Sequence, residues 1–195
     1  FDLRSYKKKD KLSLPFPDYV GVNGQAAKKK YLDGGYPVHN LVEVEALRYL
    51  YLDDIFEDKA AVRTNVKNGK TVLVLGDYLK ENNIKQMKLL QDAQRLIDQP
   101  IEYIMKSHPA CQLIVKDYPD LNLTVVGSAI DVLVKQCDIA YTSSFTSAAV
   151  DVYCAGKPVV TILDDSGLNM SPLRGYKDVS FLSTAQELAN VFNNI

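Results

Sequence analysis

Two segments decide the fold, because each is an apolar run that ends in a polar cluster: IEYIMKSHP (residues 101–109) and CDIAYTSSFTS (residues 137–147). Short apolar runs rich in β-branched and aromatic side chains are typical of strands buried on both faces. In an open parallel sheet, ligands bind outside the carboxyl ends of the strands. We therefore expect the two polar clusters to form one anion-binding site.

Strand-like and helix-like patterns alternate around these segments. Strands are expected at 71–75, 101–106, 123–126, 139–142, 159–163 and 179–181. Helices are expected from about 78 to 99, near 110–116, near 130–137, at 145–155 with Phe145 inward, and after a capping box of Thr184 and Glu187. The first helix should bury a face made of Ile84, Met87, Leu90, Ala93 and Ile97. This order predicts an α/β fold with a doubly wound parallel sheet.

A smaller unit precedes this sheet. A strand at 18–22, a helix at 25–32 and a strand at 41–44 form one β-α-β unit that is too small to bury its own core. We expect residues 1–50 to be the remnant of a neighbouring domain, 51–70 a linker and 71–195 the main domain. Because the sequence begins at Phe1, we also expect a piece of a longer protein.

Composition narrows the function classes. A hydrophobic fraction of 47% and a charged fraction of 24% are ordinary for a globular protein, and a net charge of −1 argues against a nucleic-acid binder. Three cysteines without metal-ligand spacing favour a reducing, cytoplasmic setting. The clusters 7–9 and 28–30 are all lysine and could contact a polyanionic acceptor or the inner face of a membrane. The alternative is a solvated face.

His108 is the candidate catalytic residue. At the carboxyl end of a strand, its ring N–H can donate to a phosphate oxygen, while Pro109 ends the strand. Lys106, two residues earlier, lies on the same side of the strand and could add positive charge. The alternative is a histidine that only caps a turn.

The second cluster holds five hydroxyl residues in six positions, of which Ser143, Ser144, Thr146 and Ser147 are candidate ligands of the anion. The first turn of the expected helix offers unpaired N–H groups and the positive end of the helix dipole. Simple N-capping by serine is the alternative.

Weaker candidates follow two other expected strands. Gly76 and Asp77 follow the strand at 71–75, and Ser128 follows the strand at 123–126. These residues could approach a nucleotide or sugar, or could serve only as turn residues. The aspartates at 164 and 165 have no further ligand spaced to complete a metal site. The sequence has no dinucleotide-binding glycine motif, no P-loop and no nucleophile elbow, which disfavours dehydrogenases and nucleoside triphosphatases.

These residues carry a resemblance. Lys106-Ser107-His108-Pro109 and Ser143-Ser144 resemble the His-Pro and Ser-Ser motifs of bacterial sialyltransferases and Kdo transferases. The stretch 142–160 also resembles surface-carbohydrate biosynthesis proteins, and residues 22–37 are similar to the last β-α-β unit of the N-terminal domain in related GT-B proteins. The resemblance implies that residues 71–195 are the Rossmann-like, nucleotide-sugar-binding half of a GT-B glycosyltransferase.

By that likeness, the motifs hold the phosphate of a CMP-sugar donor and assist departure of the nucleotide without a metal or other cofactor. The acceptor would be a glycan or lipid-linked glycan of a surface polysaccharide or lipopolysaccharide. The family's catalytic acidic pair lies in the N-terminal domain, and Leu32-Asp33-Gly34-Gly35 departs from its pattern. The chain should therefore bind donor better than it turns it over. Two alternatives stay open: a sugar-nucleotide epimerase, and a non-catalytic phosphoglycan-binding module.

Overall fold

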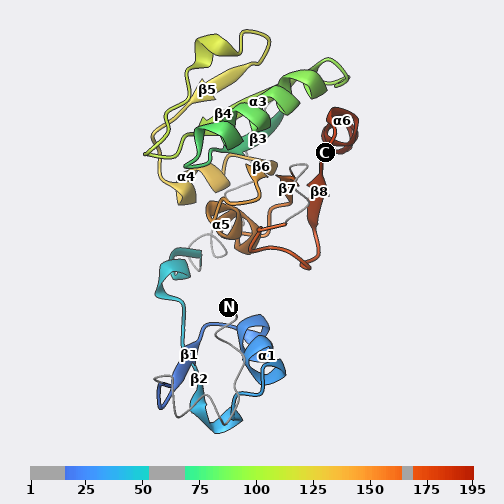
Figure 1. Cartoon of the computed structure of the whole chain (residues 1–195). Coiled ribbons are helices and arrows are strands. Elements are labelled where there is room, and N and C mark those ends of the chain that lie inside the picture. The colour runs from blue at the N-terminus through green and yellow to red at the C-terminus, as the bar shows by residue number, and fades with distance from the viewer. Residues whose placement is uncertain (1–15, 53–68, 164–168) are drawn as a thin grey trace. The chain divides into compact units, whose positions relative to one another are not determined.

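The computed structural model describes residues 16–52, 69–163 and 169–195. The chain divides into two compact units, Phe1–Leu50 and Tyr51–Ile195, which are described separately (Figure 1). The lysines at 7–9, the aspartates at 164 and 165, and most of the expected linker lie outside the described residues.

The first unit contains the expected β-α-β arrangement. The parallel strands β1 (Val20–Val22) and β2 (Leu41–Glu43) are joined by helix α1 (Gln25–Asp33) and a 3-10 turn, η2 (Val38–Asn40). Its small core is built on Val22, Tyr36 and Leu41. Lys28 forms an ion pair with Glu43, and a second 3-10 turn, η3 (Leu47–Tyr49), follows β2.

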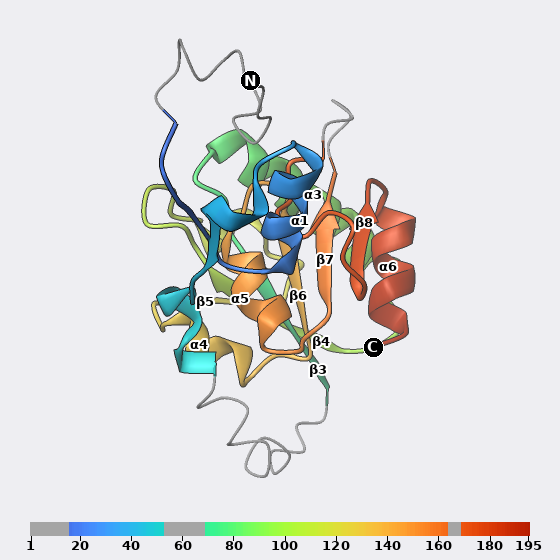
Figure 2. The ribbon, with the colours of Figure 1, turned by 90° about the horizontal axis from the view of Figure 1, so that it is seen from below.

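The second unit is built on a six-stranded sheet in which all neighbouring strands are parallel, in the order β5-β4-β3-β6-β7-β8. The strands β6, β7 and β8 lie side by side with helix α6 outside β8 (Figure 2). This confirms the predicted doubly wound α/β class. The strands are β3 (Lys70–Leu75), β4 (Ile101–Lys106), β5 (Leu123–Val125), β6 (Ile139–Ser143), β7 (Val159–Ile162) and β8 (Val179–Leu182).

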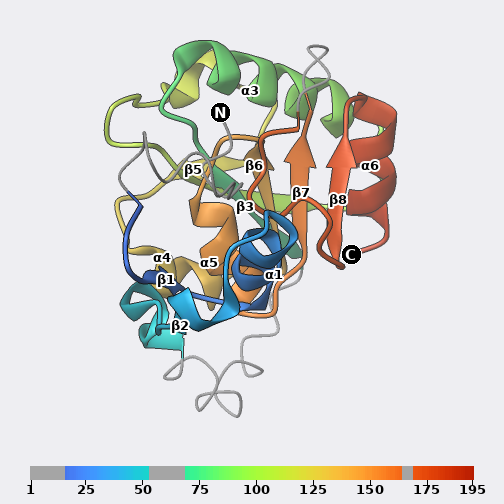
Figure 3. The same ribbon diagram turned by 60° about the horizontal axis from the view of Figure 1, so that its bottom comes forward.

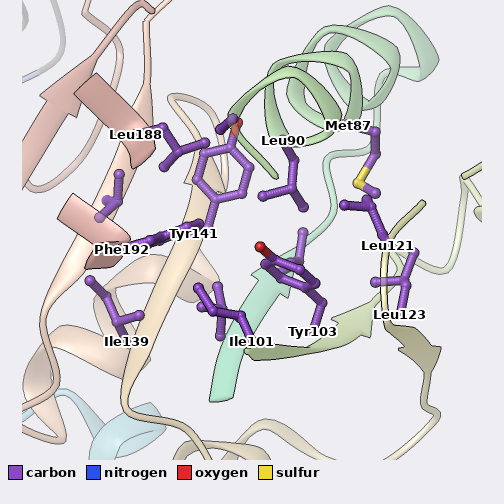
Figure 4. Close-up of a cluster of buried hydrophobic side chains, with 14 of the residues drawn as sticks. Met87, Leu90, Ile101, Tyr103, Leu121, Leu123, Ile139, Tyr141, Leu188 and Phe192 are labelled. Carbon is purple, nitrogen blue, oxygen red and sulfur yellow. The ribbon is translucent and has the colours of Figure 1, made fainter. Parts of the chain in front are cut away.

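Each face of the sheet packs against its own helices (Figure 3). Successive strand side chains point to opposite faces, so Val72 and Val74 of β3 join one core, whereas Leu73 and Leu75 join the other. The first core is covered by α3 (Lys80–Gln94) and α6 (Ala185–Asn193), and Tyr141 packs there edge-on against Phe192 (Figure 4). The second is covered by α4 (Ile130–Val134) and α5 (Ala148–Cys154).

Two helix predictions are wrong in detail. No α-helix forms over 110–116, because a bridge between His108 and Cys111 closes a turn directly after Pro109. Only a 3-10 turn, η5 (Val115–Asp117), follows. The helix expected at 145–155 begins only at Ala148. The residues after β6 first form a turn, in which the Ser143 hydroxyl accepts a hydrogen bond from Phe145 N. Phe145 is 41% exposed, whereas the prediction placed it inward.

The face of α3 agrees with the prediction at Met87, Leu90 and Ala93 but not at Ile84. Ile84 is 50% exposed, and the buried positions are Asn83, Gln86, Met87, Leu90 and Ala93. Two amide side chains thus occupy the face that the apolar pattern assigned to hydrophobic residues. The capping box of Thr184 and Glu187 at the start of α6 is confirmed.

Burial of the Cys137 thiol gives a pH prediction. Burial raises the pKa of Cys137 to about 11, from an ordinary value of 9.0. A raised folded-state pKa favours the neutral thiol, so its contribution is complete below pH 9 and is lost as pH rises through 11. We expect the free energy of unfolding to fall by about 2–3 kcal/mol between pH 9 and pH 11 because of this thiol. Urea unfolding measures this effect: the difference in unfolding free energy between wild type and Cys137→Ala should become smaller as the pH rises over this range.

The partly buried Cys111 gives a second variant, Cys111→Ala, that also removes one thiol. A gap for Cys137→Ala that is independent of pH would contradict the prediction.

Candidate functional site

A pocket of about 180 Å³ opens at the carboxyl end of the sheet, where the loops after β3, β4 and β6 meet. Strands β3 and β6 are neighbours in the sheet, and the connections leave them toward opposite sides. This is the switch point at which doubly wound sheets bind ligands. The pocket is lined by Leu75, Gly76, Asp77, Tyr78, Lys106, Ser107, His108, Pro109, Phe145, Thr146, Ser147 and Ala148.

Asp77 is the buried centre of this site, with only 2% of its surface exposed. Its Oδ2 accepts hydrogen bonds from the Ser143 hydroxyl and from Asn82 Nδ2 at 2.9 Å. Its Oδ1 accepts from the main-chain N–H of Leu79, also at 2.9 Å. The carboxylate therefore joins the loop after β3 to the loop after β6.

Asn83 fixes the backbone of the same turn. Its Oδ1 accepts from Asp77 N and its Nδ2 donates to Asp77 O, both at 2.8 Å. Gly76 lies at a close approach: a Cβ there would lie 3.3 Å from both Asn83 Oδ1 and His108 N, and 3.0 Å from Met105 Cε. A side chain at this position would therefore require these neighbours to move by a few tenths of an ångström.

The Ser143 hydroxyl forms hydrogen bonds with other groups of the protein. Besides donating to Asp77, Ser143 Oγ accepts from Phe145 N at 3.3 Å and lies 2.9 Å from Thr146 Oγ1. It thus shapes the turn that presents Thr146 and Ser147 to the pocket. Because α5 begins only at Ala148, these hydroxyls precede the helix instead of forming its first turn.

His108 caps its own turn and also lines the pocket. Its Nδ1 accepts from Ala110 N at 3.1 Å, which is the turn cap. The ring proton therefore lies on Nε2, which is left as the donor of the neutral imidazole. The edge of Tyr78 meets the His108 ring at a centroid distance of 6.2 Å. The cap orients the ring and does not prevent donation to a ligand.

Lys106 lines the same pocket and donates from Nζ to the main-chain oxygen of Ser128 at 2.6 Å. An ammonium group has three donors, so this bond positions the charge without exhausting it. Ser128 itself is exposed and does not line the pocket. Ser144 lines a different pocket together with Ser143. Of the predicted residues, Ser143 is joined to the site through Asp77 but lines the other pocket, and Ser144 and Ser128 lie outside the site pocket. The pocket is lined by the rest: Gly76, Asp77, Lys106, His108, Pro109, Thr146 and Ser147.

Sequence reasoning missed the amide residues of α3, namely Asn82, Asn83 and Gln86. The available signal was an Asn-Asn pair beside a Gln, all within two turns of the start of the helix that follows Asp77. Among the described residues, no three His, Cys, Asp or Glu side chains gather as metal ligands. In the same part of the chain, no helix is both long and apolar enough to cross a bilayer.

No family model and no curated protein sequence matches the chain. Among solved structures, it is similar to the H444N variant of the wall teichoic acid polymerase TagF, with 14% identity over 91% of this chain and 48% of that one, and a TM-score of 0.52. UDP-GlcNAc 2-epimerase from Methanocaldococcus jannaschii gives 12% identity over 91% and 56%, with a TM-score of 0.57. Arabidopsis thaliana UGT89C1 complexed with UDP gives 12% identity over 90% and 49%, with a TM-score of 0.54.

The chain thus spans about half the length of these structures. At such low identity the likeness shows the fold alone, which is the Rossmann-like half of a GT-B fold with a small two-stranded parallel sheet before it.

Proposed function

We propose that residues 71–195 are the donor-nucleotide-binding half of a GT-B-type glycosyltransferase. The observation that carries the proposal is the switch-point pocket, where His108, Lys106, Thr146 and Ser147 surround a space of about 180 Å³. An N–H donor, an ammonium group and hydroxyls on one wall are the groups that bind phosphate oxygens. The exposed ring of Tyr78 beside His108 offers a surface for a nucleobase.

In this proposal, His108 donates from Nε2 to a phosphate oxygen and stabilises the charge that develops when the nucleotide leaves. Lys106 supplies positive charge, which a site without a metal would need. Leu32-Asp33-Gly34-Gly35 lies where α1 ends and does not supply the paired acid of the family motif. We therefore expect residues 1–195 alone to bind donor nucleotide better than they turn it over.

The donor class follows from the motif likeness. The His-Pro and Ser-Ser clusters favour a CMP-activated sugar such as sialic acid or Kdo, transferred to a surface polysaccharide or lipopolysaccharide. The fold neighbours include a plant protein solved with UDP, which makes UDP the competing nucleotide. The exposed Lys29 and Lys30 of α1 would contact a polyanionic acceptor or the inner face of the membrane, in a cytoplasmic protein.

A second candidate function is a sugar-nucleotide epimerase, because the M. jannaschii UDP-GlcNAc 2-epimerase shares this fold with a TM-score of 0.57. A non-catalytic module that binds phosphoglycan is the third. An epimerase would modify the sugar of UDP-GlcNAc without any acceptor, whereas a phosphoglycan module would ignore the nucleobase.

The test is a titration of the ¹⁵N-labelled chain with CMP and UDP, with and without Mg²⁺, following backbone amide shifts. Shifts at Gly76, His108 and Thr146 with CMP, unchanged by Mg²⁺, would support the sialyltransferase-like or Kdo-transferase-like proposal. The same shifts with UDP only would discard that donor class and keep both the glycosyltransferase and the epimerase proposals. An absence of shifts with both nucleotides would contradict a nucleotide site in this unit.

Replacement of His108 by alanine should weaken nucleotide binding by about 1–3 kcal/mol, because a hydrogen bond to a charged phosphate is lost. Calorimetry with the nucleotide found above measures the change. The matched control is His39→Ala, which removes the other histidine, in η2 of the first unit. Unchanged affinity with a lower melting temperature would show that His108 only caps its turn.

A further inference from the structure

Phe145 is an exposed aromatic residue in the wall of the site pocket. It lies in the turn between β6 and α5, where its neighbours Ser144, Thr146 and Ser147 are all hydroxyl residues. The apolar pattern predicted this ring inward, but the residue is 41% exposed. Among the phenylalanines of the described ranges, it is the one that is exposed. The phosphate contacts of the proposed site do not use its side chain.

The backbone of Phe145 is fixed by the interior of the site. Phe145 N donates to Ser143 Oγ at 3.3 Å, and the Ser143 hydroxyl donates to the buried Asp77 carboxylate. Thr146 Oγ1 lies 2.9 Å from the same Ser143 oxygen. These bonds hold a turn whose one apolar residue is left exposed beside the pocket. A surface that is already in place costs a ligand less ordering entropy than a mobile one.

The pocket has aromatic residues from two different loops. Tyr78 follows β3, is 52% exposed, and its ring lies 6.2 Å from the His108 ring. Phe145 follows β6 and stands next to Thr146 in the chain. A donor whose phosphate lies between His108 and Thr146 carries its nucleoside on one side of the phosphate and its sugar on the other. With Tyr78 as the surface for the nucleobase, Phe145 is left for the sugar.

The chemistry of Phe145 suits a sugar ring. One face of a pyranose consists largely of C–H groups, whose partial positive charge matches the electron-rich face of an aromatic ring. Binding pockets commonly combine such aromatic walls with a few polar groups that fix the orientation of the ligand. In this pocket, the hydroxyls of Thr146 and Ser147 lie on the same turn as the phenyl ring and supply the polar groups.

We infer that Phe145 contacts the C–H face of the donor sugar and is a specificity-determining residue of the site. The inference rests on the proposed function, which supplies the phosphate and nucleoside contacts. Because free nucleotide has no sugar at this position, Phe145 favours the intact donor over the nucleotide product. The substrate class is therefore a nucleotide-activated pyranose that presents an apolar face to this turn.

Calorimetry with the whole chain measures the affinities for CMP, CMP-N-acetylneuraminate, UDP and UDP-N-acetylglucosamine. We expect Phe145→Ala to bind one of the two nucleotide-sugars about five- to tenfold more weakly, and to bind its free nucleotide within about twofold of wild type. The variant keeps the main-chain N–H that donates to Ser143, so the turn is retained. Phe145→Tyr keeps a ring and should restore the affinity, whereas the apolar but ringless Phe145→Leu should not.

The matched control is Tyr176→Ala, which removes an aromatic side chain of similar exposure, 43%, outside the site pocket. NOEs between the Phe145 ring and the C–H protons of the sugar, absent in Phe145→Leu, would report the contact directly. The inference is overturned if Phe145→Ala loses nucleotide and nucleotide-sugar affinity equally, or loses neither. A wild-type chain that binds nucleotides no more weakly than nucleotide-sugars would overturn it too. Failure of both free nucleotides to bind would instead contradict the proposed function.

Discussion

Replacement of Asp77 by alanine is expected to lower the free energy of unfolding by about 3–4 kcal/mol and to abolish nucleotide binding. The side chain is buried and accepts from the Ser143 hydroxyl, from Asn82 and from the N–H of Leu79. Alanine would leave these three donors without their acceptor. An unpaired buried group costs about 1–3 kcal/mol, and the bonds from Asn82 and Leu79 are only partly buried, so their loss costs less. The net loss of stability is smaller than this sum, because the variant no longer has to bury a charged carboxylate.

The loss of binding has a separate cause. Asp77 ties the loop after β3 to the turn after β6, and that turn presents Thr146 and Ser147 to the pocket. Without the tie, the donors that surround a phosphate are no longer held in one arrangement. Urea unfolding measures the first effect, and calorimetry with the nucleotide, at a temperature where the variant is folded, measures the second.

Asp77→Asn separates charge from shape. An amide has one acceptor oxygen, whereas both carboxylate oxygens of Asp77 accept from donors. Asparagine must therefore turn its NH₂ group toward at least one donor, so we expect a smaller but clear loss of stability. The exposed Asp120 gives the control, since Asp120→Ala should change neither property. An Asp77→Ala variant with wild-type affinity would show that the tie does not organise the pocket.

The sequence was sufficient to predict the sheet, for a physical reason. Apolar runs such as 71–75 and 101–106 are buried on both faces of the sheet. In a chain that alternates strands and helices, such a run has few possible structures other than a central parallel strand. Local signals also worked, as in the capping box of Thr184 and Glu187, because both partners lie within one helical turn.

The interior of the site was harder to predict, because its bonds join residues that are distant in sequence. Ser143 and Asp77 are 66 positions apart, and no local pattern shows that the serine hydroxyl is used by a buried carboxylate. The apolar spacing of α3 favoured Ile84, but polar loops and strand ends surround the first turns of that helix. There the amides of Asn83 and Gln86 satisfy more polar groups than an isoleucine could.

Gln86 illustrates this competition and gives the second large effect. Its side chain is fully buried, and Nε2 donates to the main-chain oxygen of Leu75 at 3.2 Å and of Tyr141 at 3.3 Å. These oxygens belong to the neighbouring strands β3 and β6, close to the ends that form the site. We expect Gln86→Leu to lower the free energy of unfolding by about 1–3 kcal/mol, because leucine fills the space but removes both hydrogen bonds from the side chain to the strand carbonyls.

Chemical unfolding of Gln86→Leu should be compared with Gln91→Leu, which makes the same change at a partly exposed position of the same helix. The control should change stability by less than about 0.5 kcal/mol. The two polar atoms of the Gln86 side chain, Nε2 and Oε1, affect the free energy of unfolding in opposite directions. Gln86 Oε1 is buried and has no hydrogen-bond partner among the described residues, so leucine also removes an unpaired acceptor. If Gln86→Leu stabilised the protein, the cost of burying the unpaired Oε1 would exceed the gain from the two Nε2 hydrogen bonds. The role of Gln86 would then be to fix the geometry of the strand ends and not to stabilise the fold.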